Sequence, residues 1–304
     1  MARSVPLPAA LPDAFTVAQG VAAGLAPSRL RSGGTPAPFH GVRVRAGVAT
    51  TTLRQRCAAY APRLTAAQFF SHETALALVG APMPEWPYVP GIHVSAHRPA
   101  REPRTSGIRG HRLQTREPAT ITSAGVRCEH PVRAWRQAGR LWALGDLVAA
   151  ADFLIAGDAP LASLDELRAE IAAMGDMSGS LLMRALRRSR YGVRSARETR
   201  LRLLLEDAGL PQPETGWNLR DERGAFVAEL DLAYPRYRVG VEYDGRVHAE
   251  SIAQFERDAD RWDAIRSRGW SHCRILSHHL RAGGRPAIQK VAEALIAAGW
   301  SSGR

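Results

Sequence analysis

The chain has 304 residues, of which 45% are hydrophobic and 23% charged, and it carries a formal net charge of +12 at pH 7. This composition is typical of a globular protein and argues against a disordered or fibrous chain. No apolar run is long enough to span a bilayer, so neither a membrane protein nor a membrane partner is expected.

The cysteines indicate a reducing compartment. Cys57, Cys128 and Cys273 are scattered and form no CxxC pair, so the sequence predicts neither a zinc site nor a disulfide framework. The N-terminal segment is broken by prolines and lacks the continuous apolar stretch of a signal peptide. A cytoplasmic location is the expectation.

The positive charge is concentrated in the first part of the chain. Residues 1–120 hold 14 arginines and 5 acidic residues. A basic region of this kind predicts a polyanionic partner, and DNA is the first candidate. Nearly all the cationic residues are arginine, since Lys290 is the only lysine in the sequence.

Residues 1–62 have the pattern of a small domain with two short helices and a strand. Thr16-x-x-Gln19 is a capping signal for a helix that ends at Gly24, and Pro27 favours the start of a second helix. Residues 38–45 alternate like a strand or wing. This order resembles the winged-helix domain of the abortive-infection (AbiEi-type) antitoxins, which implies DNA contacts by Arg29 and Arg43. A small helical adaptor with a solvated arginine face is the alternative.

Residues 63–192 are predicted to be a mixed basic segment followed by a helical connector. Ser71 is a candidate cap for a helix that Gly80 ends, and residues 92–94 have the pattern of a strand. A loop dense in cations follows, in which Arg109 is a candidate DNA contact that would follow the phosphate backbone. The histidines show no metal-ligand spacing and receive no role. Residues 131–190 have a helical pattern.

Residues 193–304 open with a helix and continue with two acidic strands. Ser195-x-x-Glu198 is a capping box for a helix that ends at Gly209. The segments 226–233 and 237–243 are predicted strands joined at Pro235. Alternation along the first strand places Glu229 and Asp231 on one face, and along the second it places Glu242 and Asp244 on one face. An antiparallel pairing in suitable register would bring Asp231 close to Glu242.

The repulsion within such a pair of carboxylates has to be offset by a positive charge. Two carboxylates about 4 Å apart repel by roughly 4 kcal/mol at an effective dielectric constant near 20. A divalent cation such as Mg²⁺ would provide this, because it takes oxygen ligands. A network of arginines is the alternative, and its candidate members are Arg236, Arg238, Arg246 and Arg261.

The ordered motifs in this last third of the chain resemble a nuclease family. Asp231 followed by Glu242-x-Asp244 is similar to the PD-(D/E)xK core. The surrounding residues resemble the bacterial domain-of-unknown-function 559 family, which is related to the very-short-patch-repair endonucleases. They are the runs Tyr234-Pro235-Arg236-Tyr237-Arg238-Val239, Asp244-Gly245-x-x-His248, Arg257-Asp258-x-x-Arg261 and Gly269-Trp270-Ser271-His272-Cys273-Arg274. The resemblance implies an α/β domain like the restriction endonucleases, with the order helix, hairpin strands, helix, strand, helix.

This resemblance implies metal-dependent hydrolysis of DNA with Mg²⁺ or Mn²⁺ as cofactor. Asp231 and Glu242 would bind the metal, and Glu198 is a candidate third ligand as well as a capping residue. The usual lysine of the motif is absent, because Asp244 stands at its position. His248 would therefore transfer the proton, and Asp244 would orient it or bind a second metal. Arg274 is a candidate phosphate contact.

Two other classes of function stay open. The missing lysine favours a DNA-binding antitoxin or transcriptional regulator whose nuclease fold has lost catalysis, with a toxin as its protein partner. The acidic cluster is also consistent with a module that binds a basic protein.

Overall fold

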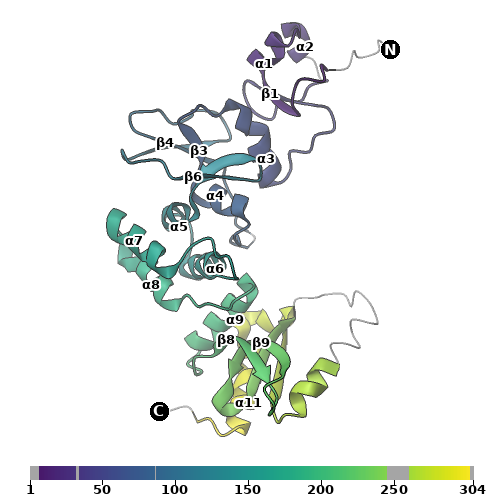
Figure 1. Cartoon of the computed structure of the whole chain (residues 1–304), viewed down its shortest axis with the longest axis vertical. Helices are drawn as coiled ribbons and strands as arrows, with labels where there is room; N and C mark the ends of the chain where they lie inside the picture. The colour runs from purple at the N-terminus through teal and green to yellow at the C-terminus, as the bar shows by residue number, and fades with distance from the viewer. Residues whose placement is uncertain (1–6, 32–33, 86, 245–259, 302–304) are drawn as a thin grey trace. The chain divides into compact units, whose positions relative to one another are not determined.

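The computed structural model describes residues 7–31, 34–85, 87–244 and 260–301, and Figure 1 shows its elements in chain order. These residues form three β-sheets and a set of α-helices, so the predicted α/β class is confirmed. The chain divides into two compact units: Met1–Ala143 with Asp165–Leu182, and Leu144–Leu164 with Met183–Arg304. Among the described helices, none has both the length and the apolar character needed to cross a bilayer.

The first unit opens with the two predicted helices and the predicted strand, which pairs antiparallel with a further short strand, β1 (Ala14–Thr16). The other elements are α1 (Val17–Ala22), α2 (Pro27–Arg31) and β2 (Val42–Val44). The capping box is confirmed, because the Gln19 amide donates to Thr16 Oγ1 at 3.1 Å and the Thr16 amide donates to Gln19 Oε1 at 2.7 Å. Phe15 and Leu30 are buried in the core of this segment.

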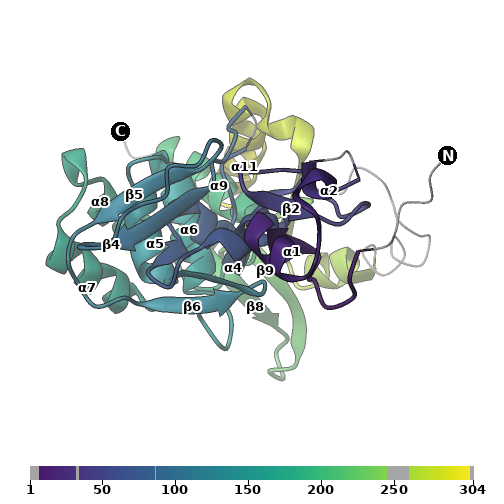
Figure 2. The ribbon, with the colours of Figure 1, turned by 90° about the horizontal axis from the view of Figure 1, so that it is seen from above.

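A five-stranded sheet follows, with the strand order β5-β4-β3-β7-β6. The helices beside it in the chain are α3 (Leu53–Tyr60) and α4 (His72–Val79). The strands are β3 (Gln68–Phe70), β4 (His93–His97), β5 (Arg109–Leu113), β6 (Thr120–Ser123) and β7 (Val126–Glu129). β4 runs antiparallel to β3 and parallel to β5, which lies beside it (Figure 2).

Two predictions about this region are corrected. The stretch from His97 to Arg112, predicted as a loop, contains β5, because pairing with β4 satisfies the backbone groups of this segment. Ser71 stands at the N-cap of α4 as predicted, but its hydroxyl contacts the side chains of His72 and Ser95 instead of capping a helix amide.

The helical pattern predicted for residues 131–190 is confirmed by four α-helices. They are α5 (Pro131–Ala138), α6 (Leu144–Leu154), α7 (Leu164–Met174) and α8 (Leu181–Arg188). The two units divide them, since α5 and α7 belong to the first unit and α6 to the second. The partition of the chain at residues 62 and 192 therefore stays a prediction.

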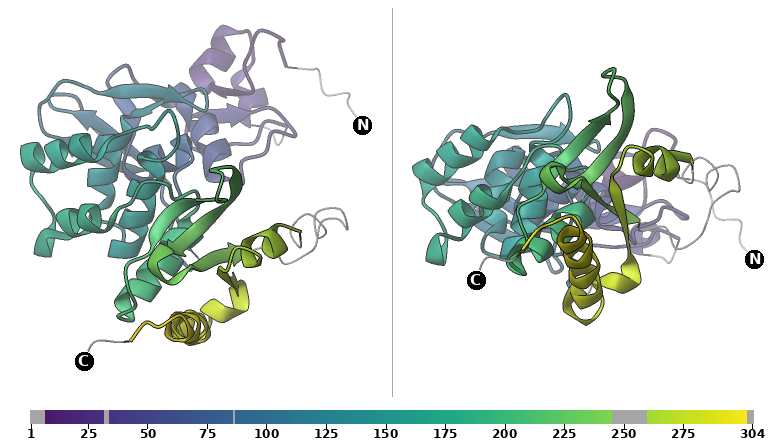
Figure 3. Two further views of the ribbon diagram at one scale, coloured as in Figure 1. Left: turned by 60° about the horizontal axis from the view of Figure 1, so that its bottom comes forward. Right: turned by 90° about the horizontal axis from the view of Figure 1, so that it is seen from below.

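The second unit is built on a four-stranded sheet with the order β11-β10-β9-β8. The strands are β8 (Glu214–Arg220), β9 (Phe226–Tyr234), β10 (Val239–Asp244) and β11 (Ser271–Leu276). The first three run antiparallel in succession, with β8 and β9 forming the green hairpin of Figure 3, whereas β11 is parallel to β10. β8 is absent from the sequence prediction.

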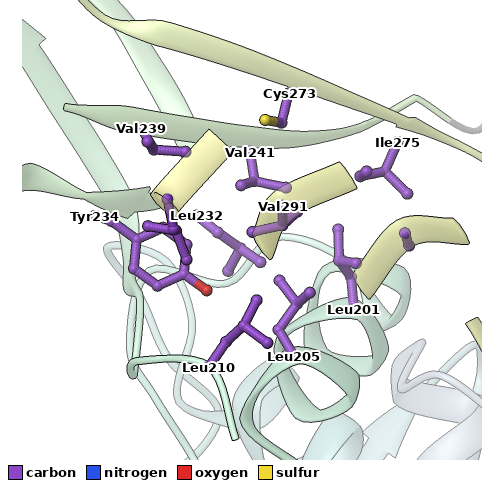
Figure 4. Packing of buried hydrophobic residues seen from close by; sticks show 12 residues of the cluster. Leu201, Leu205, Leu210, Leu232, Tyr234, Val239, Val241, Cys273, Ile275 and Val291 are labelled. Carbon is purple, nitrogen blue, oxygen red and sulfur yellow. The ribbon is translucent and has the colours of Figure 1, made fainter. Parts of the chain in front are cut away.

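Two helices cover one face of this sheet. They are α9 (Ala196–Asp207) and α11 (Arg285–Ala297). Leu201 of α9 and Val291 of α11 point toward Val241 of β10 in one buried cluster (Figure 4). Alternate residues of β10 therefore face this core, and the residues between them, including Glu242, face the other side of the sheet.

A buried ion pair links α6 to α9 within the second unit. Arg202 is fully buried and donates to Asp152 Oδ2 at 2.9 Å, while Thr199 Oγ1 donates to the same oxygen at 2.8 Å. The Arg190 amide donates to the other carboxylate oxygen at 2.7 Å. Burial raises the pKa of the Asp152 carboxyl, and the charge of Arg202 opposes this effect. Because each charge compensates the other, the two helices pack without an isolated buried charge.

Candidate functional site

Asp231 lies where the regular pairing of β9 stops. The register pairs Val241 with Leu232, and its continuation would place Glu242 opposite Asp231. The backbone ladder ends there, and the Tyr243 amide instead donates to Asp231 Oδ2 at 2.9 Å. On the other side, β8 pairs with the neighbours of Asp231 but not with Asp231 itself. The β8 residue opposite Asp231 is Gly216, which has φ of 59°. The Asp231 carboxylate thus accepts a hydrogen bond that a backbone carbonyl would accept in a regular sheet.

The alternation of side chains changes phase at this residue. Leu230 packs in a cluster with Ile265, whereas Leu232 packs with Leu201 of α9 in the other cluster. In an undisturbed strand both leucines would face the same side. The prediction of unbroken alternation along β9 is therefore wrong, because the irregular pairing at Asp231 turns the strand.

Glu198 lies at the start of α9 and serves both the helix end and the acidic cluster. The Glu198 amide donates to Ser195 Oγ at 3.2 Å, so half of the predicted capping box is confirmed. The Glu198 carboxylate closes back one residue earlier than predicted, on the Arg194 amide at 2.9 Å. Its charge also acts on Asp231, so the same residue does contribute to both features.

The charges of Glu198 and Glu242 both act on the carboxyl group of Asp231. The pKa of Asp231 rises to about 7, chiefly because the side chain is buried, and the charges of Glu198 and Glu242 raise it further. The hydrogen bond from the Tyr243 amide and the charge of Arg261 oppose this rise. A half-buried carboxyl beside two other carboxylates favours its neutral form unless a cation approaches, and Asp231 is such a group.

Glu242 and Asp244 already have cationic partners. Both terminal nitrogens of Arg261 donate to Glu242, and His272 Nε2 lies 3.0 Å from Glu242 Oε2. The Arg274 guanidinium donates to Asp244 Oδ2, with Nε at 2.9 Å. The structure therefore contains part of the arginine network considered from the sequence, with Arg261 as its member.

An aromatic ring, Trp262, packs against Arg274 and His272. The guanidinium carbon of Arg274 lies 4.6 Å from the centroid of the Trp262 ring, and the His272 ring stacks on Trp262 at 5.7 Å. Such cation–π contacts stabilise an arginine and restrict its orientation. Arg274, predicted as a phosphate contact, is thus held between Asp244 and Trp262.

The other predicted site residues fall in different parts of the chain. His248 lies outside the described residues, so its proton-transfer role stays a prediction. Arg109 is exposed on β5, and Arg29 lies on α2. Arg43 of β2 donates to the carbonyl oxygens of Leu30 and Val42, which gives it a structural role in the N-terminal segment.

Among the described residues, the side chains whose ligand atoms lie close enough together to share a metal ion are three histidines, and not the predicted carboxylates. Nitrogen atoms of His72, His93 and His111 all lie within 4.8 Å of one another, a spacing that the Glu198, Asp231 and Glu242 set does not reach. The sequence assigned these histidines no role, and their spacing along the chain indeed gives no signal. Strand pairing brings them together, since β4 pairs with β5 and also with β3, which precedes His72.

His72 and His111 are neutral at physiological pH. Burial lowers the pKa of His72 to about 2 and that of His111 to about 4, and the neighbouring imidazoles lower both further. A neutral imidazole keeps one nitrogen lone pair available, which is the form that binds metals.

Comparisons with known proteins give a partial similarity. No protein-family model and no solved structure matches the chain. It is 31% identical over 87 residues to uncharacterized protein Rv2248 of Mycobacterium tuberculosis strain H37Rv and, equally, to uncharacterized protein MT2308 of strain CDC 1551. The similar segment covers 29% of this chain and 32% of each relative. The chain thus matches about a third of the relatives' length.

Proposed function

We propose that this protein is a metal-dependent DNA endonuclease and that Asp231 is its central metal ligand. The observation that carries the proposal is the environment of Asp231. This half-buried carboxyl lies beside two other carboxylates, and its hydrogen bond comes from the neutral Tyr243 amide. A divalent cation would relieve this repulsion, because it stabilises the ionised form of every carboxylate around it.

The residues fit such a cation in part. Asp231 and Glu198 offer carboxylate oxygens from β9 and α9, the ligand type that Mg²⁺ and Mn²⁺ prefer. Glu242 would join them by exchanging Arg261 and His272 for the metal. When bound, the cation supplies an activated water and neutralises the charge of the phosphodiester. Arg261 and Arg274 are then the groups of this chain that are placed to receive phosphate oxygens.

The topology of the second unit supports the same proposal. A helix is followed by three antiparallel strands and then by a strand parallel to the third. Apart from the additional strand β8, this order agrees with the restriction-endonuclease-like fold that the motifs imply. The acidic residues come from the helix, the second strand and the third strand, the elements that the resemblance assigns to the active site.

A second candidate function is a DNA-binding regulator without catalysis. The observation in its favour is the ion pairing of Glu242 with Arg261 and of Asp244 with Arg274. These pairs neutralise two of the acids within the protein. A nuclease core that has lost metal binding would retain such pairs as structural contacts.

Nicking of supercoiled plasmid by the purified chain distinguishes the two functions. We expect cleavage with Mg²⁺ or Mn²⁺, none with EDTA, and a loss of at least about 100-fold in Asp231→Asn, because metal-held carboxylates supply several kcal/mol of transition-state stabilisation. Glu229→Gln is the matched control, since Glu229 lies two residues away and pairs with the exposed Arg194. Equal inactivity of all three proteins with retained DNA binding would establish the regulator instead.

A further inference from the structure

The first unit contains a second candidate site, at the junction of α4, β4 and β5. His72 begins α4, and His93 and His111 lie on the paired strands β4 and β5. We propose that these three histidines bind a first-row transition-metal ion such as Zn²⁺, with an open coordination position that faces an arginine-lined cavity. This site is separate from the carboxylates of the second unit and does not depend on the endonuclease proposal.

The His93 and His111 rings already face each other as two ligands would. His93 Nδ1 lies 2.8 Å from His111 Nε2, and the two ring planes are nearly parallel, with an angle of 8° between them. One proton therefore lies between two nitrogen atoms. Zn–N distances of about 2.0–2.1 Å in a tetrahedral site require roughly 3.3 Å between such nitrogens. An opening of about half an ångström would let a metal ion replace the proton.

His72 completes the set from the neighbouring helix. Its ring stacks on His111 with 4.0 Å between centroids, so a rotation of this side chain would turn its nitrogen toward the other two. Its backbone has φ of 53°, a left-handed conformation that is unfavourable for histidine. The Gln137 side chain accepts a hydrogen bond from the His72 amide at 3.0 Å and so helps to hold this conformation. Strained residues of this kind cluster at functional sites.

The partners behind the rings are those of metal-binding histidines. His93 Nε2 lies 3.3 Å from Glu73 Oε1, which is long for a hydrogen bond. Glu73 is fully buried. The amide of Gly91 and the indole of Trp142 donate to Glu73 at 2.8 and 2.9 Å. A carboxylate behind an imidazole fixes the tautomer and strengthens its other nitrogen as a ligand. It leaves His93 Nδ1, the nitrogen that faces His111, as the ligand atom.

His72 has the same arrangement with a hydroxyl in place of the carboxylate. His72 Nδ1 lies 2.9 Å from Ser71 Oγ, and Ser95 donates to that hydroxyl at 2.6 Å. The Nε2 atom of His72 is then the one that remains for a metal. Three imidazole ligands suit Zn²⁺, Co²⁺ or Ni²⁺, whereas Mg²⁺ prefers oxygen ligands.

The cavity beside these histidines indicates what the open position would bind. It has a volume of about 320 Å³, and His72 and His111 form part of its wall. Five arginines and two glutamates also line it: Arg112, Arg116, Arg133, Arg136, Arg140, Glu129 and Glu170. Arg116 pairs with Glu170 through both terminal nitrogens, so the remaining arginines outnumber the acids. A metal with a fourth position open to this cavity suits an oxyanion such as phosphate.

Titration of the full-length protein with Co²⁺ tests the proposal, because tetrahedral Co²⁺ has visible absorption bands. We expect one Co²⁺ per chain and displacement by Zn²⁺. His111→Ala, a half-buried position on the edge strand β5, should abolish the signal. Glu73→Gln should weaken the affinity by about 10- to 100-fold, as expected for the loss of a partner behind a ligand.

Two control variants exclude other sites. His278→Ala removes an exposed member of the His278 and His279 pair, and Asp231→Asn alters the acidic cluster; both should retain the wild-type spectrum. Circular dichroism checks that each variant is folded. A wild-type protein that binds no Co²⁺, or a folded His111→Ala with an unchanged spectrum, would overturn the assignment. Inorganic phosphate should shift the Co²⁺ bands, and an unaltered spectrum would show that the fourth position is closed to the cavity.

Discussion

The environment of Asp231 predicts that Asp231→Asn stabilises the folded protein in the absence of divalent cations. Asparagine has nearly the same shape and can still accept the hydrogen bond from the Tyr243 amide. It removes the charge that burial, Glu198 and Glu242 all disfavour. A site that costs stability without its ligand is the usual trade-off between stability and activity.

The size of the effect follows from the pKa of Asp231, which rises from 3.8 to about 7 on folding. Each unit corresponds to about 1.36 kcal/mol, so the ionised form costs at most about 4 kcal/mol above pH 7. Partial exposure of the side chain reduces this to roughly 2 kcal/mol. Because the folded pKa is raised, the favourable contribution of the protonated carboxyl is complete below about pH 4 and is lost as pH rises through about 7.

Urea unfolding of wild type and Asp231→Asn in EDTA, at several pH values between about 4 and 8, measures this. We expect nearly equal free energies of unfolding at the acidic end and an advantage of about 2 kcal/mol for the variant at the alkaline end. Glu229→Gln serves as the control, because its partner Arg194 is exposed and such a pair contributes about 0–1 kcal/mol. A variant that is less stable than wild type at pH 8, or a difference independent of pH, would refute the reasoning.

Two further predictions concern the ion pairs of the second unit. Asp152→Ala should lower the free energy of unfolding by about 3–5 kcal/mol in urea titrations, because it leaves the fully buried Arg202 without its main counter-charge; a loss below 1 kcal/mol would contradict this account. Arg261→Leu should tighten Mn²⁺ binding, because Arg261 competes with the metal for Glu242. The binding is measured from the loss of the electron paramagnetic resonance signal of free Mn²⁺. Unchanged Mn²⁺ affinity in a folded Arg261→Leu would favour the regulator over the nuclease.

Local patterns in the sequence were sufficient for most of the elements. The capping box at Thr16 and the helices between residues 131 and 190 were predictable because caps and helical periodicity depend on residues three or four positions apart. The acidic strands β9 and β10 were recognised from their apolar residues and from Pro235 between them. β8 was missed, because its mixed residues, Glu214 to Arg220, show no clear alternation.

The sequence alone determined the α/β class, most of the helices and the acidic residues of the second unit, since all of these follow from periodicity and residue type. The tertiary structure decided which side chains meet. Only the register at Asp231 shows the break in alternation, and only the fold places Arg261 on Glu242. The three histidines illustrate the same limit: His72, His93 and His111 become neighbours because β4 pairs with both β3 and β5, and such pairing joins residues far apart in the chain and leaves no local signal.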